Sequence, residues 1–298
     1  MPSKRCPRTI IAKRRRTDRV RVHFLGVRGS TPAPGSDFVR YGGHTSCIAI
    51  TRDGEEIPSL ILDAGTGIRL CSALCGDRPY AGTILLGHLH WDHLHGLPFF
   101  RAGDREDARI DLYVPQQSDG TSALDVLVRG MSPPHFPIRP DELRGQWTFN
   151  SLAPSTRVFE GFTVVSREIP HKGGRTFGYR VSDANSTLTY MSDHCPSEIG
   201  PGPDGWGEYH DVAMELARDT DLLIHDSQLV AEEHAREAVY GHAAAEYAVE
   251  LGRRANAQRV ALFHHRPDRT DEELDLIGRR FESTPHVVVA DQSMVMEL

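Results

Sequence analysis

Short apolar runs separated by polar or glycine-rich segments recur along the chain, and most of them have the length of a strand. The first series predicts strands at 20–25, 45–51, 59–62, 83–86 and 112–114. A second series predicts strands at 158–168, 177–182, 187–191, 221–225, 259–263 and 287–289. Apolar positions at helical spacing predict helices that start at Ile68 and that span 242–256. This order favours an α/β protein, and we expect residues 20–298 to form one compact domain.

Histidines and aspartates gather just after the ends of several predicted strands. The densest group, HLHWDHLH at 88–95, follows the strand at 83–86 and holds four of the chain's 16 histidines. Several imidazole nitrogens and one carboxylate in a single cleft suit zinc or a similar borderline metal. The alternative is a polar loop whose histidines are solvated, but a motif this dense is specific where a single histidine is not.

A site for two metals needs about three protein ligands per metal, so this motif alone is too small. Three further candidates stand just past predicted strands: His171, Asp193 and His264. Taken singly, they have plain alternatives as a surface histidine, a turn aspartate and the cap of a strand end. Together with the HxHxDH motif they complete a set of five histidines and two aspartates, which is far less easily accidental.

The charge of the chain is unevenly distributed. Residues 1–19 carry a formal charge of +7, so residues 20–298 carry −14, given −7 for the whole chain. We expect residues 1–19 to be a disordered, solvated arm; an anchor to nucleic acid or to a membrane surface is the alternative. The acidic remainder is a poor surface for a large nucleic acid, because phosphate binding needs clustered lysines and arginines.

Neither the basic arm nor the rest of the chain has an apolar run long enough for a signal peptide or a transmembrane helix. The five cysteines are an odd number at irregular spacing, which is typical of reduced thiols rather than of a disulfide framework. We therefore expect a cytoplasmic protein with no membrane partner.

These motifs resemble the metallo-β-lactamase superfamily, in the branch of ribonuclease Z and its cyclic-nucleotide phosphodiesterase relatives, among them the anti-Pycsar type. The resemblance covers nearly all of the chain beyond the arm, including LDAGTG at 62–67, HxHxDH at 88–93, LIHD at 223–226 and LFHH at 262–265. It implies a four-layer αββα sandwich and a binuclear metal-dependent hydrolase.

The resemblance also implies how the ligands divide between two divalent ions, for which zinc is expected and manganese is the alternative. One ion would be held by His88, His90 and His171, and the other by Asp92, His93 and His264, with Asp193 bridging them. His264 is preferred over the adjacent His265 because the family pattern Leu-x-His aligns with it. In such a site a metal-activated hydroxide attacks phosphorus. His95 has no ligand role in the family and is expected to pack or to form a hydrogen bond behind the site.

Phosphodiesterases of this branch carry a second group of catalytic residues. The resemblance places His242 beside the scissile phosphate, where it would protonate the leaving oxygen or donate a hydrogen bond to the phosphoryl group. Asp226 would orient His242, although relatives carry a glutamate at this position. The residues expected to act in catalysis are therefore Asp92, Asp226 and His242.

Two features predict the substrate: the lack of a long arm, and the loop at 131–137. Ribonuclease Z carries a long arm between the equivalents of His171 and Asp193, and only 21 residues separate them here. The loop MSPPHFP at 131–137 resembles small cyclic-nucleotide phosphodiesterases, so His135 and Phe136 are candidate substrate contacts, with a rigid lid or a dimer contact as the alternative. Arg28 is a weaker candidate.

We therefore predict a homodimeric phosphodiesterase that hydrolyses a small nucleotide, most simply a 3′,5′-cyclic mononucleotide, and that binds no large nucleic acid. The alternatives are a ribonuclease Z-like enzyme that cleaves transfer-RNA 3′ ends, another hydrolase of this fold such as a lactonase, and a non-catalytic binder of cyclic nucleotides.

Overall fold

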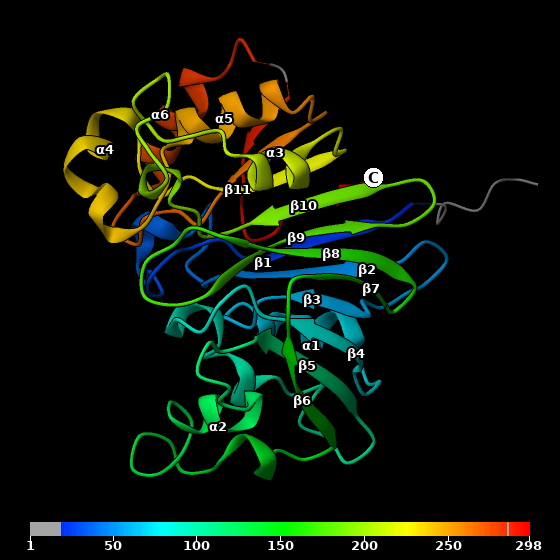
Figure 1. Cartoon of the computed structure of the whole chain (residues 1–298). Helices are drawn as coiled ribbons and strands as arrows, with labels where there is room; N and C mark the ends of the chain where they lie inside the picture. The colour runs from blue at the N-terminus through cyan, green and yellow to red at the C-terminus, as the bar shows by residue number, and fades with distance from the viewer. Residues whose placement is uncertain (1–18, 285) are drawn as a thin grey trace, which may run out of the picture.

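Two seven-stranded mixed sheets form the centre of the molecule, shown in Figure 1 as a computed structural model that describes residues 19–284 and 286–298. The predicted disordered arm therefore lies almost entirely outside the described residues, and its division from the domain stays a prediction. The four cysteines in the described part are buried and free. None of the helices there combines the length and the apolar character that crossing a bilayer requires.

The first sheet is built mainly from the N-terminal half, and its strands from β3 to β6 run parallel. In spatial order its strands are β14 (Val295–Glu297), β1 (Arg21–Gly26), β2 (Cys47–Thr51), β3 (Leu60–Leu62), β4 (Ala81–Leu85), β5 (Arg109–Pro115) and β6 (Gln146–Leu152).

The second sheet comes from the C-terminal half, and its strands from β10 to β13 run parallel. In spatial order its strands are β13 (Val287–Val289), β12 (Val260–Phe263), β11 (Leu222–Asp226), β10 (Thr187–Met191), β9 (Thr176–Ser182), β8 (Phe162–Ile169) and β7 (Ser155–Phe159).

Helices cover the outer faces of the two sheets (Figure 1). The α-helices are α1 (Ile68–Cys75) and α2 (Ala123–Val128) on the first sheet, and α3 (Asp211–Ala217), α4 (Ala231–Glu237), α5 (Ala245–Arg254) and α6 (Asp271–Arg280) in the C-terminal half. Short 3-10 helices lie in the loops: η1 (Ser36–Phe38), η2 (Trp91–His93), η3 (Leu97–Phe99), η4 (Pro140–Glu142), η5 (Pro196–Glu198) and η6 (Ala238–Tyr240).

Three apolar cores separate these layers. The central core lies between the sheets and contains fully buried side chains from both, such as Phe24, Ile224 and Phe263. A second core joins α1 to the outer face of the first sheet, and a third joins α3, α5 and α6 to the outer face of the second. Helix, sheet, sheet and helix therefore follow one another, which confirms the predicted αββα sandwich.

The structure differs from the predicted elements in two places that matter for the site. The apolar run at 158–168 is a hairpin, β7 and β8, because Glu160 and Gly161 turn the chain with positive φ. The helix predicted over 242–256 begins only at Ala245, since Ala244 lies extended and forms a bridge with Leu229. His242 therefore precedes the helix.

Candidate active site

All seven predicted metal ligands lie together at one edge of the sandwich. Their potential ligand atoms form three overlapping groups, and within each group the atoms lie within 4.8 Å of one another. The groups are His88, His90 and His171; Asp92, His93, Asp193 and His264; and His171, Asp193 and His242.

Strand ends bring these residues together although they are far apart in the sequence. His88 and His90 follow β4, and Asp92 and His93 lie in the single turn η2 just beyond. In the second sheet, His171 follows β8, Asp193 follows β10 and His264 follows β12. Because β10, β11 and β12 are parallel neighbours, their carboxyl ends share one edge of the sheet, and that edge faces the end of β4.

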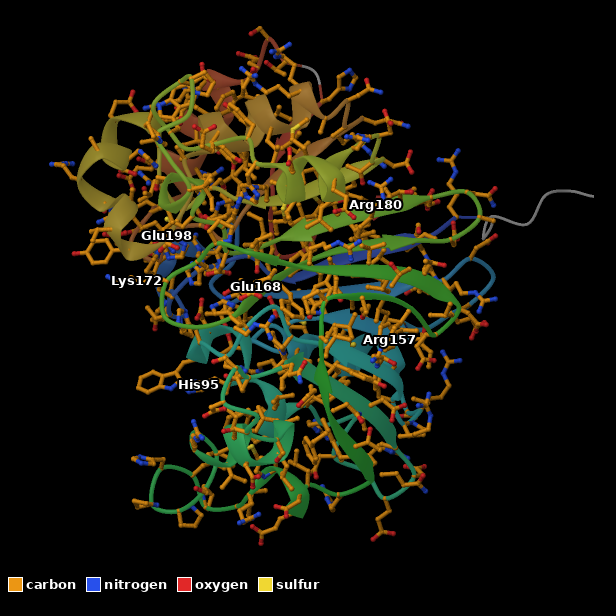
Figure 2. The ribbon with its side chains drawn as sticks, viewed as in Figure 1. His95, Arg157, Glu168, Lys172, Arg180 and Glu198 are labelled. Atoms are coloured by element: carbon orange, nitrogen blue, oxygen red, sulfur yellow. The ribbon has the colours of Figure 1, made fainter. Side chains whose placement is uncertain are left out.

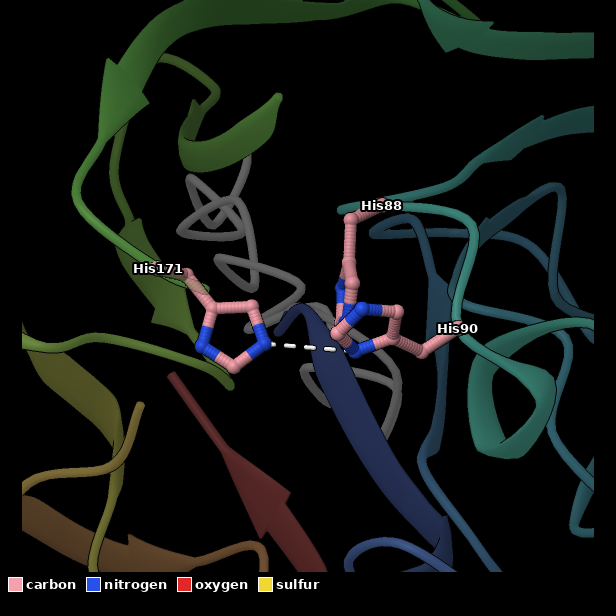
Figure 3. A group of neighbouring side chains, drawn as sticks. All are labelled: His88, His90 and His171. Carbon is pink, nitrogen blue, oxygen red and sulfur yellow. Dashed lines mark hydrogen bonds between the residues drawn. The ribbon is translucent and has the colours of Figure 1, made fainter. Parts of the chain in front are cut away.

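The first group consists of three imidazole rings that converge on a common point (Figure 3). His171 Nε2 lies 3.3 Å from His90 Nδ1. His171 donates from Nδ1 to the carbonyl oxygen of Gly241 at 2.6 Å, so its neutral form carries an unprotonated Nε2 that faces His90. Such an arrangement presents lone pairs to a shared position, as metal ligation requires.

The second group places three carboxylate or imidazole side chains around Asp193, which is almost fully buried. Asp193 lies 3.1 Å from His93 Nε2 and 3.2 Å from His264 Nε2. The same carboxylate lies 3.6 Å from His171 Nε2 and 3.8 Å from His88 Nε2. It therefore faces both groups, which is the position expected of a bridging ligand.

The buried polar atoms at this edge lack the hydrogen bonds that such atoms normally make. Within the described chain, both ring nitrogens of His88, the Nε2 atoms of His93 and His264, and Asp193 Oδ2 have no partner. A divalent ion would satisfy these atoms, and their donor chemistry is that of zinc sites. The buried histidine–aspartate cluster thus fits a divalent metal site, whereas the number and identity of the ions stay predictions.

The electrostatic surroundings of these histidines agree with a role as metal ligands. Burial lowers the pKa of His88 well below its usual value and also lowers the pKa of His264, so both rings stay neutral and can act as ligands. At His93 burial opposes protonation, yet the carboxylates of Asp193 and Asp92 outweigh it and raise the pKa. The position beside His93 Nε2 therefore attracts a cation, whether a proton or a metal.

Asp63 supports the site, and we assigned it no role from the sequence. Its Oδ2 accepts hydrogen bonds from His93 Nδ1 and from the Tyr190 hydroxyl, both at 2.7 Å, and its Oδ1 accepts from the Gly87 backbone at 2.6 Å. Donation from Nδ1 leaves His93 Nε2 free to face Asp193. The signal was available, because Asp63 is a charged residue directly after the apolar run of β3.

His242 and Asp226 form a close pair beside the cluster. His242 Nδ1 lies 3.0 Å from Asp226 Oδ2 and 4.0 Å from Asp193 Oδ1. Burial lowers the pKa of His242, but the negative charge of Asp226 and the hydrogen bond to it outweigh this effect, and the pKa is raised. The pairing of these two residues is as predicted, although their catalytic roles stay predictions.

A cleft of about 1780 Å³ runs along α1 and η3, and none of the seven candidate ligands lines it. His135 and Phe136 line it, together with His95, Thr66 and Phe99, and Phe136 meets Phe99 edge-on with ring centroids 6.1 Å apart. The predicted substrate contacts thus lie in a cleft, but their role towards a substrate stays a prediction.

The expectation for His95 was wrong. Its side chain is exposed and stacks on the exposed ring of Trp91, with centroids 5.3 Å apart, instead of packing behind the site. Figure 2 shows it on the same side of the molecule as Lys172 and Glu198.

The prediction that Arg28 contacts substrate was also wrong. The side chain is fully buried and donates to the carbonyl oxygens of Gly42, Arg266 and Arg269 at 2.8, 3.2 and 2.6 Å. Asp271 lies 3.7 Å away and compensates its charge. Arg28 therefore ties the loop before β2 to the segment after β12 and has no surface left for a ligand.

Comparison with known proteins agrees with this geometry. Residues 60–265 match the model of the beta-lactamase superfamily domain. The chain belongs to this superfamily. It is a metal-dependent hydrolase with ribonuclease Z-like relatives, as the sequence motifs predict.

Two curated relatives illustrate the likeness. Ribonuclease Z of Gemmatimonas aurantiaca is 24% identical over 319 residues, covering 93% of this chain and 95% of the relative. Ribonuclease Z of Methanothermobacter thermautotrophicus is 28% identical over 327 residues, covering 93% and 96%. Both alignments are longer than the 298 residues of this chain, so these relatives contain segments that it lacks.

Solved structures share the fold. The metallo-β-lactamase fold protein YhfI from Bacillus subtilis has a TM-score of 0.66 at 18% identity, covering 94% of this chain and all of the other. The short form of human tRNase Z has a TM-score of 0.62 at 20% identity, covering 93% and 98%. A diphosphatase of the PhnP family has a TM-score of 0.65 at 18% identity, covering 94% and 97%.

Replacing Asp63 with asparagine is expected to weaken metal binding. The substitution keeps the shape of the side chain but removes the charge that holds the His93 tautomer, and loss of such partners weakens metal affinity about 10–100-fold. Zinc affinity is measured by competition with a chromophoric chelator, with Asp53→Asn at an exposed turn as the control. Equal affinity in Asp63→Asn and the unaltered protein would show that Asp63 does not support the ligands.

Replacing Arg28 with leucine is expected to destabilise the fold. Loss of a buried charge leaves Asp271 and three carbonyl groups without their partner, which costs about 3 kcal/mol. Chemical denaturation measures the effect, and Arg157→Leu on the exposed face of β7 is the control. A variant with full stability but a raised KM would instead restore Arg28 as a substrate contact.

Proposed function

We propose that the protein hydrolyses phosphodiesters with two divalent ions held by the seven candidate ligands. The contact between His242 and Asp226 carries this proposal, since it sets a histidine with a raised pKa beside Asp193 at the edge of the cluster. A metal-binding cluster alone serves many reactions of this fold. A buried acid–base pair next to it suits a reaction in which a poor leaving group must be protonated.

His242 and Asp226 divide the task of proton transfer. Because Asp226 Oδ2 accepts from Nδ1, only the cationic form of His242 carries a proton on Nε2 as well. The charge of Asp226 stabilises that form. When the bond from phosphorus to the leaving oxygen breaks, Nε2 gives its proton to that oxygen, and His242 returns to the neutral form.

Bound divalent ions supply Lewis acidity and a nucleophile that exists at neutral pH. The chain's own contribution is to fix the ligand atoms before any substrate arrives. Gly241 holds His171, Asp63 holds His93, and the Ser46 hydroxyl lies 3.1 Å from His264 Nδ1, so each ring has one possible orientation towards the cluster. We expect zinc, with manganese as the alternative.

Cleavage of RNA in the manner of ribonuclease Z is the activity that the comparisons favour. The curated relatives described above are ribonuclease Z proteins, and their names favour the ribonuclease alternative over our prediction of a cyclic mononucleotide.

A small cyclic nucleotide remains the second candidate because of one feature. The segment from 172 to 192 is filled by β9, β10 and their turns, with no space for the long arm expected of ribonuclease Z. His135 and Phe136 in the cleft are the corresponding candidate contacts for a base or sugar. We also retain the homodimer as a prediction from the family resemblance.

A turnover panel on the purified protein distinguishes these substrates. We expect a precursor transfer RNA with a 3′ trailer to be cleaved with a higher kcat/KM than 3′,5′- or 2′,3′-cyclic mononucleotides, in the presence of zinc or manganese. The reverse order would favour the cyclic nucleotide. Lactone hydrolysis without phosphodiester hydrolysis would contradict the proposal, as would intact nucleotide recovered from a tight complex without turnover.

Replacing His242 with alanine is expected to lower kcat about 10²–10⁴-fold on the preferred phosphodiester while metal content stays the same. The measurement pairs steady-state kinetics with elemental analysis, and Tyr240→Phe at an exposed neighbouring position is the control. A His242→Ala variant with full activity would exclude the proposed proton transfer.

A further inference from the structure

Three histidines outside the candidate ligand groups form a continuous chain behind Asp226. His210 Nε2 lies 2.8 Å from His194 Nε2, and His194 Nδ1 lies 2.9 Å from His225 Nε2. His225 Nδ1 in turn lies 2.7 Å from the backbone carbonyl oxygen of Asp226. The three rings come from different elements: the residue before α3, the segment after β10, and β11 itself.

The hydrogen-bond partners at the two ends fix every proton in this chain. At the outer end the backbone N–H of Ala213 points to His210 Nδ1, which is therefore unprotonated, so His210 carries its proton on Nε2. That proton is donated to His194 Nε2, which leaves the His194 proton on Nδ1. His194 then donates to His225 Nε2, and His225 donates from Nδ1 to the Asp226 carbonyl.

The hydrogen bond at the inner end of the chain requires the same tautomers. A carbonyl oxygen only accepts, so His225 Nδ1 must donate to Asp226, and a neutral His225 then accepts from His194. Each link thus holds one proton, and all three rings are neutral. A second proton on His194 would face the Nε2–H of His210, and no tautomer of His210 could accept it without opposing Ala213.

Aromatic side chains cover the two inner rings of this chain, whereas His210 at the outer end is partly exposed. The rings of His194 and His225 are fully buried, and each lies 5.6 Å from the ring of Tyr247. Tyr209 stacks on Tyr247 at 4.8 Å, nearly parallel to it. Burial lowers the pKa of all three histidines, in agreement with the neutral tautomers.

The chain ends on the residue that orients His242. Asp226 is held at three points: its carbonyl by the His225 ring, its Oδ2 by the backbone N–H of His194 at 3.1 Å, and its Oδ1 by the backbone N–H of Gln228 at 2.9 Å. Because the three-histidine chain is neutral, it supplies hydrogen bonds without placing a second cation beside Asp226. The negative charge of Asp226 therefore remains directed at His242.

We propose that His194, His210 and His225 are positioning residues that hold Asp226 so that His242 delivers its proton to the leaving oxygen. This inference rests on the proposed phosphodiesterase function. It goes beyond the ligands and the His242–Asp226 pair, because it adds three histidines, of which the outermost, His210, directly precedes α3.

Nitrogen-15 NMR of histidine-labelled protein tests the chain without any activity measurement. We expect neutral His194 and His225 protonated on Nδ1 and neutral His210 protonated on Nε2, with signals assigned from single substitutions. A cationic ring in this group at neutral pH, or the opposite tautomer for any of the three, would overturn the proposal. This result is independent of whether the protein proves to be a phosphodiesterase.

Leaving-group dependence tests the positioning role. His210→Leu and His210→Gln both remove the contact with Ala213, but only glutamine can still donate to His194. We expect His210→Leu to lower kcat about tenfold on an RNA phosphodiester, whose leaving alkoxide needs a proton, and by less than about twofold on bis(p-nitrophenyl) phosphate. KM and metal content should not change, and His210→Gln should restore most of the activity.

Three outcomes are decisive. Equal losses on the two substrates would mean a general structural effect, and no loss on either would mean that the chain has no role; both overturn the proposal. His23→Gln is the control, because His23 is a buried histidine on β1 that contacts Thr51 on β2. This substitution should change neither rate. If the unaltered protein cleaves no phosphodiester, the proposed function fails, and the NMR result alone decides the tautomers.

Discussion

The buried carboxylate of Asp193 is the constraint on which the candidate site depends. It lies among the imidazoles of both ligand groups and has an oxygen without a hydrogen-bond partner. An isolated charge at such a position is strongly unfavourable unless a cation compensates it. His88 and His264 are neutral, so a proton on His93 or a bound metal ion supplies that cation. The negative charge of Asp193 is therefore balanced only when a proton or a metal ion is bound beside it.

Around Asp193, a second set of residues fixes the orientation of two candidate ligands and of His242. Asp63 holds His93, Gly241 holds His171, and Asp226 holds His242. Asp63 follows β3 and Asp226 lies in β11, so the orientation of His93 and His242 follows from the sheets, whereas Gly241 ends η6. The three-histidine chain extends the same principle one step further, because it fixes Asp226 itself.

The sequence predicted the ligand cluster well because its members share a simple property. Each is a histidine or aspartate directly after an apolar strand, and parallel strands bring such positions to a common edge. Arg28 and His95 were misjudged because the sequence pattern says nothing about what covers a loop. Arg28 is buried by carbonyl groups more than 200 residues away in the chain, and His95 is exposed by the turn of η2. Contacts of that range become visible only in the fold.

The sequence predicted some of the helices and missed others. α1 was predicted, whereas α3 and α4 were missed because they are short. α6 was missed because charged residues dominate it, although its buried Leu274 and Ile277 recur at helical spacing. A signal for α6 was present in the capping pair of Thr270 and Glu273. The His210–His194–His225 chain could not be predicted, since its three residues come from separate elements and form no motif in the sequence.

Anomalous diffraction from crystals of the zinc-loaded protein would locate the bound ions. We expect two ions in each chain, one within about 2.0–2.2 Å of nitrogens from His88, His90 and His171, and one within that distance of donor atoms from Asp92, His93 and His264. Asp193 should contact both ions. A single ion, or ions bound by other residues while these seven remain free, would contradict this expectation.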